Sequence, residues 1–361
     1  MIKAAIIDDG APASMFGKCV SYSIMRDLKV NVSSPEAECG IHAEMCMAVM
    51  NRYLKNDEIE WLNICIIDHE TCLGSRKQLI KALEFCLEND VKVIHMSIGS
   101  TEFEDFPEIE AAVNRLTEKG TIIVAALSNS DKITYPACLE NVIGVKTTEA
   151  LKDDKLIYVE DSLENTEFLA ASKQLVKRLS GYHVTQYSNS YAAPVVTAKV
   201  LNALRENSDL NVDEMKKLLI ADSEVRPFVI PKNVGDTEIS VPVIGLCLTD
   251  DKKVEEIASE LRIKFIRDGY DAVMCTVGKK GLFGFYVKNT VEHLDFLIRF
   301  SACDIVIAVI NESAARDSEF DFDIIIADKK YNGAVNTCEF IEYSDSIKDN
   351  IYDMIINKFS E

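Results

Sequence analysis

Short apolar runs alternate along this chain with longer segments in which apolar residues recur at helical spacing. Met1–Ile7 and Gly120–Ala126 are runs of the first kind, and Ala43–Met50 opens a segment of the second kind. Short continuous apolar runs are typical of strands buried on both faces, and their alternation with helices is typical of a parallel sheet. The pattern therefore predicts an α/β fold.

The alternation stops near residue 226 and resumes near residue 241. Residues 226–240 hold two prolines and several turn-forming residues, so we expect a connector there. It would join a first domain, 1–225, whose last helix is Val212–Ala221, to a smaller α/β domain, 241–361. In the second domain the pattern predicts strands at Val241–Leu248, Tyr270–Val277, Asp304–Ile310, Asp323–Ala327 and Cys338–Tyr343, and helices at Lys253–Arg267, Val291–Ser301 and Ser346–Phe359.

Candidate chemistry lies where the apolar runs end. Asp8 ends the first strand, and Asn129 follows the strand at Gly120–Ala126. His42, one of five histidines, stands at the start of a helix, and Ser190 enters another helix through Ala-Ala-Pro. A serine hydroxyl becomes a nucleophile when a histidine takes its proton and a carboxylate orients that histidine. Taken alone, the Ser190 segment fits an ordinary capped helix equally well.

The order Asp8, His42, Asn129, Ser190, in these local contexts, resembles the subtilisin-like serine peptidases, or subtilases. Two further segments are similar to motifs of that family. Val93–Gly99 (Val-Ile-His-Met-Ser-Ile-Gly) resembles its Val-Ile-Asn-Met-Ser-Leu-Gly strand. Tyr135-Pro136-Ala137, with the Asn141–Val145 run after it, resembles the segment that follows its oxyanion asparagine. The resemblance covers about residues 1–222; the C-terminal part resembles no family that we recognise.

The resemblance implies a three-layer domain with a mostly parallel sheet, and a role for each matching residue. Asp8 would orient His42, His42 would act as general base and acid, and Ser190 would be the nucleophile. Asn129 and the Ser190 backbone N–H would form the oxyanion hole. An extended peptide substrate would lie between one wall formed by Ser97, Ile98, Gly99 and Ser100 and a facing wall formed by Ala126, Leu127 and Ser128.

Three departures from the family pattern lie beside these residues. The family's His-Gly-Thr is His42-Ala43-Glu44 here, its Gly-Thr-Ser is Ser188-Asn189-Ser190, and Ser128 replaces a glycine. None removes a catalytic group, and the sequence predicts a serine endopeptidase. The alternative is a catalytically inactive relative that binds peptides or serves as a scaffold. If the Glu44 carboxylate faces His42, it would raise the pKa of the imidazole.

The net charge and the cysteine content limit the possible binding partners and the cellular compartment. The 361 residues include 59 acidic and 39 basic side chains, a formal charge of −20, which opposes binding to nucleic acid or anionic membranes. The eleven scattered cysteines fit reduced thiols in the cytoplasm, and none has metal-ligand spacing with a histidine. Asp8 lies so close to Met1 that we expect no signal peptide, and no apolar run is long enough for a membrane span.

These expectations favour an intracellular endopeptidase without cofactor or metal. Its substrate would be a specific peptide or precursor protein, with leader removal during peptide maturation as one form of that activity. The second domain would contribute to substrate recognition. The sequence carries no indication of oligomeric state.

Overall fold

The computed structural model describes residues 1–33, 40–55, 58–68, 71, 73–231, 241–278, 284–310, 319, 321–328 and 339–360. The chain divides into two compact units. The first contains residues 1–160 and 165–227, and the second contains residues 161–164 and 228–361. Each unit is built around its own sheet, so each is described by itself.

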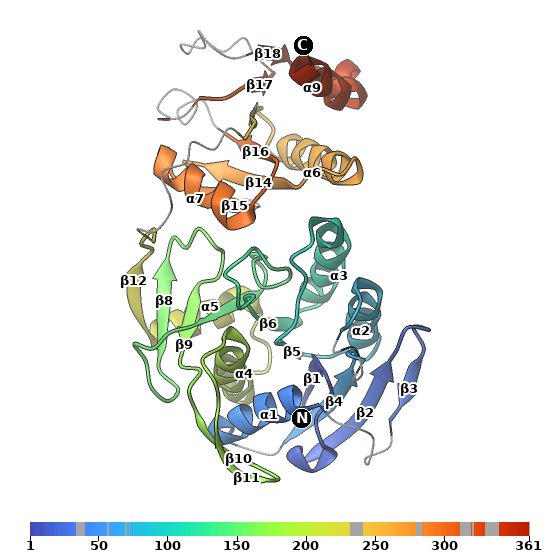
Figure 1. The fold of residues 1–361 in the computed structure, drawn as a ribbon, viewed down its shortest axis with the longest axis vertical. Helices are drawn as coiled ribbons and strands as arrows, with labels where there is room; N and C mark the ends of the chain where they lie inside the picture. Colours follow the sequence, from blue (N-terminus) through green and yellow to red (C-terminus); the bar gives the residue numbers. More distant parts are fainter. Residues whose placement is uncertain are drawn as a thin grey trace. The chain divides into compact units, whose positions relative to one another are not determined.

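The first unit contains a ten-stranded sheet whose centre is parallel (Figure 1). Its strand order is β12-β8-β9-β7-β6-β5-β1-β4-β2-β3, with antiparallel pairs at β8/β9 and β2/β3. The strands are β1 (Ile2–Asp8), β2 (Lys18–Ile24), β3 (Val30–Val32), β4 (Ile59–Cys65), β5 (Val93–Met96), β6 (Ile122–Ala126), β7 (Ile143–Thr147), β8 (Leu156–Glu160), β9 (Phe168–Ala170) and β12 (Ser223–Pro227). Because β5, β1 and β6 are neighbours and run parallel, their carboxyl ends meet at one edge.

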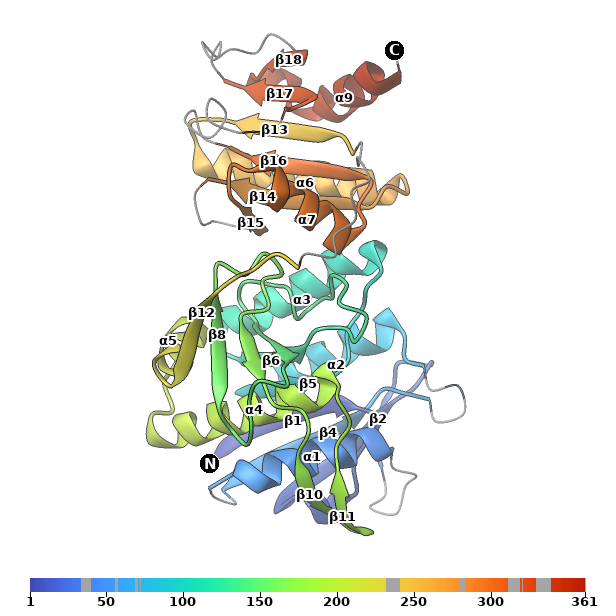
Figure 2. The same cartoon turned by 60° about the vertical axis from the view of Figure 1, so that its left-hand side comes forward.

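Helices cover both faces of this sheet (Figures 1 and 2). On one side lie α1 (Ile41–Tyr53), α4 (Asn189–Glu206) and α5 (Val212–Ala221), and on the other lie α2 (Arg76–Glu88) and α3 (Phe106–Glu118). The buried side chains of α1 and α4 form one core with those of β5, β6 and β7. A separate hairpin, β10 (Leu175–Arg178) and β11 (Gly181–Val184), precedes α4.

The second unit contains a six-stranded sheet in the order β15-β14-β16-β13-β17-β18, in which every pair is parallel. Its strands are β13 (Val243–Cys247), β14 (Ala272–Val277), β15 (Phe285–Val287), β16 (Ile305–Val309), β17 (Ile324–Ala327) and β18 (Glu339–Glu342). The helices α6 (Asp251–Arg267), α7 (Val291–Ser301) and α9 (Ile351–Ser360) accompany them.

The predicted α/β class with a large, mostly parallel sheet is confirmed, and so are the helices at Val212–Ala221 and Val291–Ser301. The expected connector differs at its start, because Arg226 and Pro227 belong to β12, which pairs with β8 at the sheet edge. The rest of that connector, from 232 to 240, lies outside the described residues. In the part of the chain that the structure describes, no helix combines the length and apolar character needed to cross a bilayer.

Candidate active site

Asp8 and His42 form a hydrogen-bonded pair. Asp8 is the last residue of β1, and its side chain is buried. His42 lies in the first turn of α1, and its Nδ1 is 2.9 Å from both carboxylate oxygens of Asp8. A carboxylate can only accept, so Nδ1 carries the proton and the neutral ring has its lone pair on Nε2. This is the tautomer that a general base for a serine requires.

Asp9 holds the start of the helix that carries His42. Its carboxylate accepts hydrogen bonds from the backbone N–H groups of His42 (3.1 Å) and Ala43 (2.7 Å). These are free donors of the first helical turn, which a residue at the N-cap position usually satisfies. The N-cap here is Gly40, and a Cβ on it would lie 1.8 Å from the Asp9 carboxylate. A side chain at this position would therefore displace the carboxylate that caps the helix.

The pKa of His42 is raised above its ordinary value by its acidic neighbours. Burial alone would lower it, but the charge and hydrogen bond of Asp8 and the charge of Asp9 outweigh burial. Glu44 contributes differently from what the sequence suggested. Its carboxylate is buried and pairs with the Arg178 guanidinium, and it accepts a hydrogen bond from the Leu179 backbone. The condition under which Glu44 would raise the pKa of His42, a carboxylate that faces the imidazole, is therefore not met.

Ser190 lies in the first turn of α4, at the same sheet edge. Its carbonyl accepts a hydrogen bond from the Ser97 hydroxyl (2.8 Å), and the Cys46 thiol of α1 lies 3.7 Å from the same oxygen. These contacts place the serine between α1 and the end of β5. Within the described residues, its hydroxyl makes no hydrogen bond with His42. Such bonds are often long in a site without substrate and shorten when substrate binds.

Asn129 connects the end of β6 to the segment that precedes Ser190. Its Oδ1 accepts hydrogen bonds from the Ser188 hydroxyl (3.1 Å) and the Asn189 backbone N–H (2.9 Å). A backbone N–H can only donate, so the bonded atom is the oxygen and the amide nitrogen points the other way. Among the described residues this nitrogen has no hydrogen-bond partner. It is therefore available to a developing oxyanion.

Asn189 is a residue whose role the sequence did not indicate. Its Oδ1 accepts from the Thr147 backbone N–H (2.8 Å), and its Nδ2 donates to the Ser128 carbonyl (2.8 Å). The side chain thus joins the ends of β7 and β6 directly before Ser190. It occupies the place where the family pattern has threonine, and an amide, with donor and acceptor, can bind both strands.

All seven residues expected to bind substrate line one pocket. Its volume is about 370 Å³, and its lining also includes Asn129 and Ser190. Apolar side chains from outside the expected walls contribute as well, namely Ile66, Ile67, Leu73 and Leu79. The pocket therefore joins Ser190 and Asn129 to a space lined by both apolar and polar side chains. The sequence did not indicate these four residues, because they lie after β4 and on α2.

The two walls differ in which backbone groups remain free. Ser100 exchanges both backbone hydrogen bonds with Tyr135, at 2.9 Å each. Leu127 donates to Val145, and both backbone groups of Ser128 are bonded. The bonded backbone groups of Ser100, Leu127 and Ser128 are therefore not free to pair with a strand of substrate. The glycine at position 99 also has a structural explanation, because a Cβ there would lie 2.6 Å from the Tyr135 carbonyl oxygen.

A metal ion does not fit the residues at this site well. The ligand atoms of Asp8, His42 and Cys46 lie within 4.8 Å of one another. Metal binding by cysteine requires the thiolate, and complete burial raises the pKa of the Cys46 thiol well above its ordinary value. The Asp8 carboxylate is already engaged with His42. This donor set favours proton transfer over metal binding.

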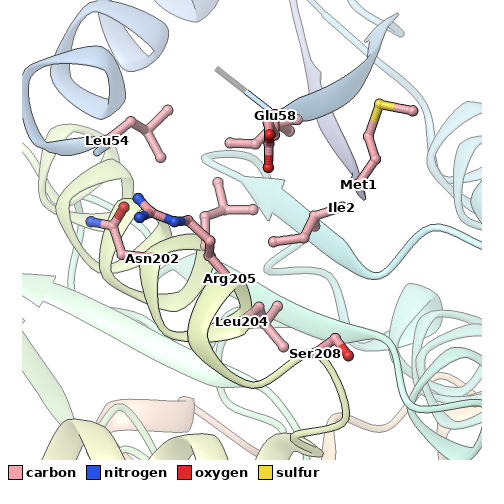
Figure 3. A pocket seen from close by; sticks show the side chains of 10 residues that line it. Met1, Ile2, Leu54, Glu58, Asn202, Leu204, Arg205 and Ser208 are labelled. Carbon is pink, nitrogen blue, oxygen red and sulfur yellow. The ribbon is translucent and has the colours of Figure 1, made fainter. Parts of the chain in front are cut away.

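A second pocket lies at the other end of β1 (Figure 3). Its volume is about 160 Å³, and its lining includes Ile2, Glu58, Asn202 and Arg205. Ile2 opens β1 and Asp8 closes it, so the length of a strand, roughly 20 Å, separates this pocket from the acidic pair. Its side chains cannot reach the groups described above.

A family model described as the subtilase family matches residues 59–245. The chain belongs to the subtilase family. The match begins after Asp8 and His42, so for these two residues it is the geometry that supports the assignment. As a subtilase, the chain has the serine peptidase fold with Ser190 and Asn129 inside the matched segment.

Curated relatives of this subtilase match over short segments. The thermostable alkaline protease of Halalkalibacterium halodurans is 31% identical over 78 residues, which are 21% of this chain and 21% of the relative. Subtilisin Savinase of Lederbergia lenta is 35% identical over 78 residues, 21% of this chain and 28% of the relative. The chain thus spans well under a third of the length of these relatives. The solved structure of Sphericase has a TM-score of 0.49 and 18% identity, covering 61% of this chain and 82% of Sphericase.

Proposed function

We propose that this subtilase is a serine endopeptidase with Asp8, His42 and Ser190 as its triad and Asn129 as an oxyanion donor. The observation that carries the proposal is the Asp8–His42 pair, which fixes the tautomer a base needs at the sheet edge where Ser190 begins α4. The tautomer of His42 and the free amide nitrogen of Asn129 are those that their proposed roles require.

The reaction would proceed through an acyl-enzyme. The Ser190 Oγ attacks the substrate carbonyl carbon while His42 Nε2 takes its proton, and Asp8 stabilises the imidazolium that forms. The oxyanion accepts hydrogen bonds from the Asn129 amide and the Ser190 backbone N–H, a free donor of the first turn of α4. The C–N bond then breaks, and His42 returns the proton to the leaving amine. Water then attacks the acyl-enzyme in the same way, with His42 again as the base, and the acid product leaves Ser190 free.

The substrate we propose is a specific peptide or precursor protein, with leader removal as one form of that reaction. Support comes from the pocket beside Ser190, whose lining combines apolar side chains with polar and charged ones. The apolar side chains of Ile66, Ile67, Leu73 and Leu79 favour a substrate with an apolar residue against them. Mass spectrometry of the products from a library of peptides tests this preference.

Labelling with a fluorophosphonate tests the activity without a known substrate. We expect one label per chain, on Ser190, and none in Ser190→Ala. Thermal unfolding of both proteins is the control, because removal of one hydroxyl should leave the fold intact. If the wild type remains unlabelled although it is folded, the enzyme proposal fails and a peptide-binding relative becomes the better description.

A cytoplasmic setting belongs to the same proposal. Its support is chemical: burial raises the pKa of the Cys46 thiol and of the Cys86 thiol, so these side chains behave as small apolar groups. Alkylation of the protein from cells lysed in acid, without prior reduction, would count the free thiols. Paired cysteines in that measurement would contradict the setting.

A further inference from the structure

The carbonyl of Ser190 lacks its normal helical partner. In an α-helix a carbonyl accepts from the N–H four residues later, and four residues after Ser190 stands Pro194, which has no N–H. A polar group at the start of a buried helix needs another donor. The Ser97 hydroxyl, 2.8 Å away, is the nearer donor, and the Cys46 thiol, 3.7 Å away, is a weaker second one. The position of the nucleophile's backbone therefore depends on a side chain at the end of β5.

Ser97 is in turn held by a histidine. Its Oγ lies 3.1 Å from Nε2 of His95, which is completely buried. The proton of Ser97 is directed to the Ser190 carbonyl, which can only accept, so Ser97 must accept from His95. Nε2 then carries the ring proton. Because a serine hydroxyl rotates freely, the donor on His95 selects the direction in which Ser97 points.

Thr197 forms a hydrogen bond with the other nitrogen of the His95 ring. Its Oγ1 lies 2.8 Å from Nδ1 of His95, and a neutral ring protonated on Nε2 accepts at Nδ1. The ring stays neutral, because burial lowers the pKa of His95 to about 4. The Thr197 hydroxyl is also 3.1 Å from the Ala193 carbonyl, but that carbonyl has the Thr197 backbone N–H, four residues later in α4, as its helical partner, so the hydroxyl proton is free to go to Nδ1. Thr197, His95, Ser97 and Ser190 thus form one continuous chain of hydrogen bonds.

We propose that His95 is a positioning residue for the nucleophile, acting through Ser97 on the backbone of Ser190. The inference rests on the proposed function, since positioning matters only if Ser190 reacts. His95 stands where the family pattern has asparagine. A misplacement of about 1 Å can cost a hundredfold in rate, and loss of the donor would free Ser97 to turn away from the carbonyl.

Four variants test this. His95→Leu and Ser97→Ala each break the chain of hydrogen bonds, whereas His95→Gln keeps an N–H near the position of Nε2. Val93→Ala, in the same strand, removes buried volume without touching the chain. The measurement is the rate of labelling by a fluorophosphonate on the folded protein, divided into the maximal rate and the half-saturating concentration. Thermal unfolding of each variant accompanies it.

We expect His95→Leu to lower the maximal labelling rate about tenfold or more, with the half-saturating concentration unchanged. His95→Gln should recover most of that loss, and Val93→Ala should lose stability but not rate. Combining His95→Leu with Ser97→Ala should cost no more than the larger single effect, because both break the same chain. Nitrogen-15 spectra of the imidazole should show the neutral, Nε2-protonated ring in the wild type.

The possible failures are distinct. An unlabelled wild type would refute the proposed function. A labelled wild type with an unchanged rate in His95→Leu would refute the positioning role alone. A rate loss that only follows the loss of stability, with Val93→Ala affected equally, would also overturn it. If His95→Leu does not fold, Ser97→Ala and the nitrogen-15 spectra decide: an unchanged rate or an Nδ1-protonated ring would contradict the proposal.

Discussion

Asn129 uses the two ends of its amide for different purposes, and a single substitution can separate them. Asn129→Asp keeps an oxygen that accepts from Ser188 and Asn189, but replaces the free N–H donor with a second, charged oxygen. We expect turnover or labelling to fall about a hundredfold or more, as is typical when an oxyanion donor is removed. Labelling kinetics measure this loss.

The control for this prediction is Asn129→Ala, which removes both the oxygen and the nitrogen of the side-chain amide. It should lower the melting temperature as well as the rate, because the Ser188–Asn189 segment loses its acceptor. Equal melting temperatures for the two variants would show that the oxygen does not hold this segment. An unchanged rate in Asn129→Asp would exclude Asn129 from the oxyanion hole.

Asp9 gives a prediction about pH. Its negative charge raises the pKa of His42, and His42 acts as a base only when neutral. In Asp9→Asn that charge is gone, the pKa of His42 falls, and the acidic limb of the pH–rate profile should move to lower pH by about half a unit. Helix α1 also loses part of its cap, at a cost of about 1 kcal/mol.

Glu44→Gln is the matched control for the pH profile. Glu44 is closer to His42 in sequence than Asp9 is, but its charge is paired with Arg178. The acidic limb should therefore stay in place when Glu44 is neutralised. A shift in Glu44→Gln that equals the shift in Asp9→Asn would mean that the limb reports overall charge and not a local effect on the imidazole.

Single residues differ in how far the sequence reveals them. Asp8, Asn129 and Ser190 were predictable because each stands where a regular element starts or ends, next to a recognisable motif. The role of Asp9 was not predictable, because it caps a helix that starts more than thirty positions later in the chain. The sequence does not show that these two segments lie next to each other in the fold. One indication did exist: Gly40 cannot cap a helix with a side chain, so another residue had to supply the acceptor.

At the level of elements, the Glu44–Arg178 pair links α1 to hairpin strand β10. The side chains of both residues are largely buried, with 9% and 15% exposed. Glu44→Gln would leave the guanidinium without its countercharge, and we expect a loss of about 2–4 kcal/mol in the free energy of unfolding. Replacing both partners, with Glu44→Leu and Arg178→Met, should recover most of it. Urea unfolding measures both effects.

The same pair predicts how stability varies with acid. Burial would raise the pKa of Glu44, but the hydrogen bond with Arg178 outweighs burial and holds the pKa below its ordinary value. A lowered pKa in the folded state means that the stabilisation is present above about pH 4.5 and is lost as pH falls. The difference in stability between wild type and Glu44→Gln should therefore shrink below that pH. A constant difference would assign the effect to packing.

Elements with continuous apolar runs were predictable, and the hairpin was not. Strands such as β6 are buried on every residue, so the run itself is the evidence. In β10 and β11 the side chains of Leu175, Tyr182 and Val184 are exposed, and only one of the eight residues is buried. A strand without a buried face carries no periodic pattern, and its pairing depends on contacts formed by the rest of the fold.

For the whole molecule, the division into two units predicts what a shortened chain can do. Asp8, His42, Asn129 and Ser190 all belong to the first unit, which ends at Pro227. A fragment of residues 1–227 should therefore still label at Ser190. Residues 161–164, between β8 and β9, group with the second unit instead, and Leu163 among them is completely buried.

The full chain is the control for this fragment, in which residues 161–164 are present without the rest of the second unit. Sedimentation, thermal unfolding and fluorophosphonate labelling compare the two proteins. We expect the same labelling rate per folded chain in both, because the strands and helices that carry the four side chains all end before residue 228. A folded fragment that fails to label would contradict this prediction.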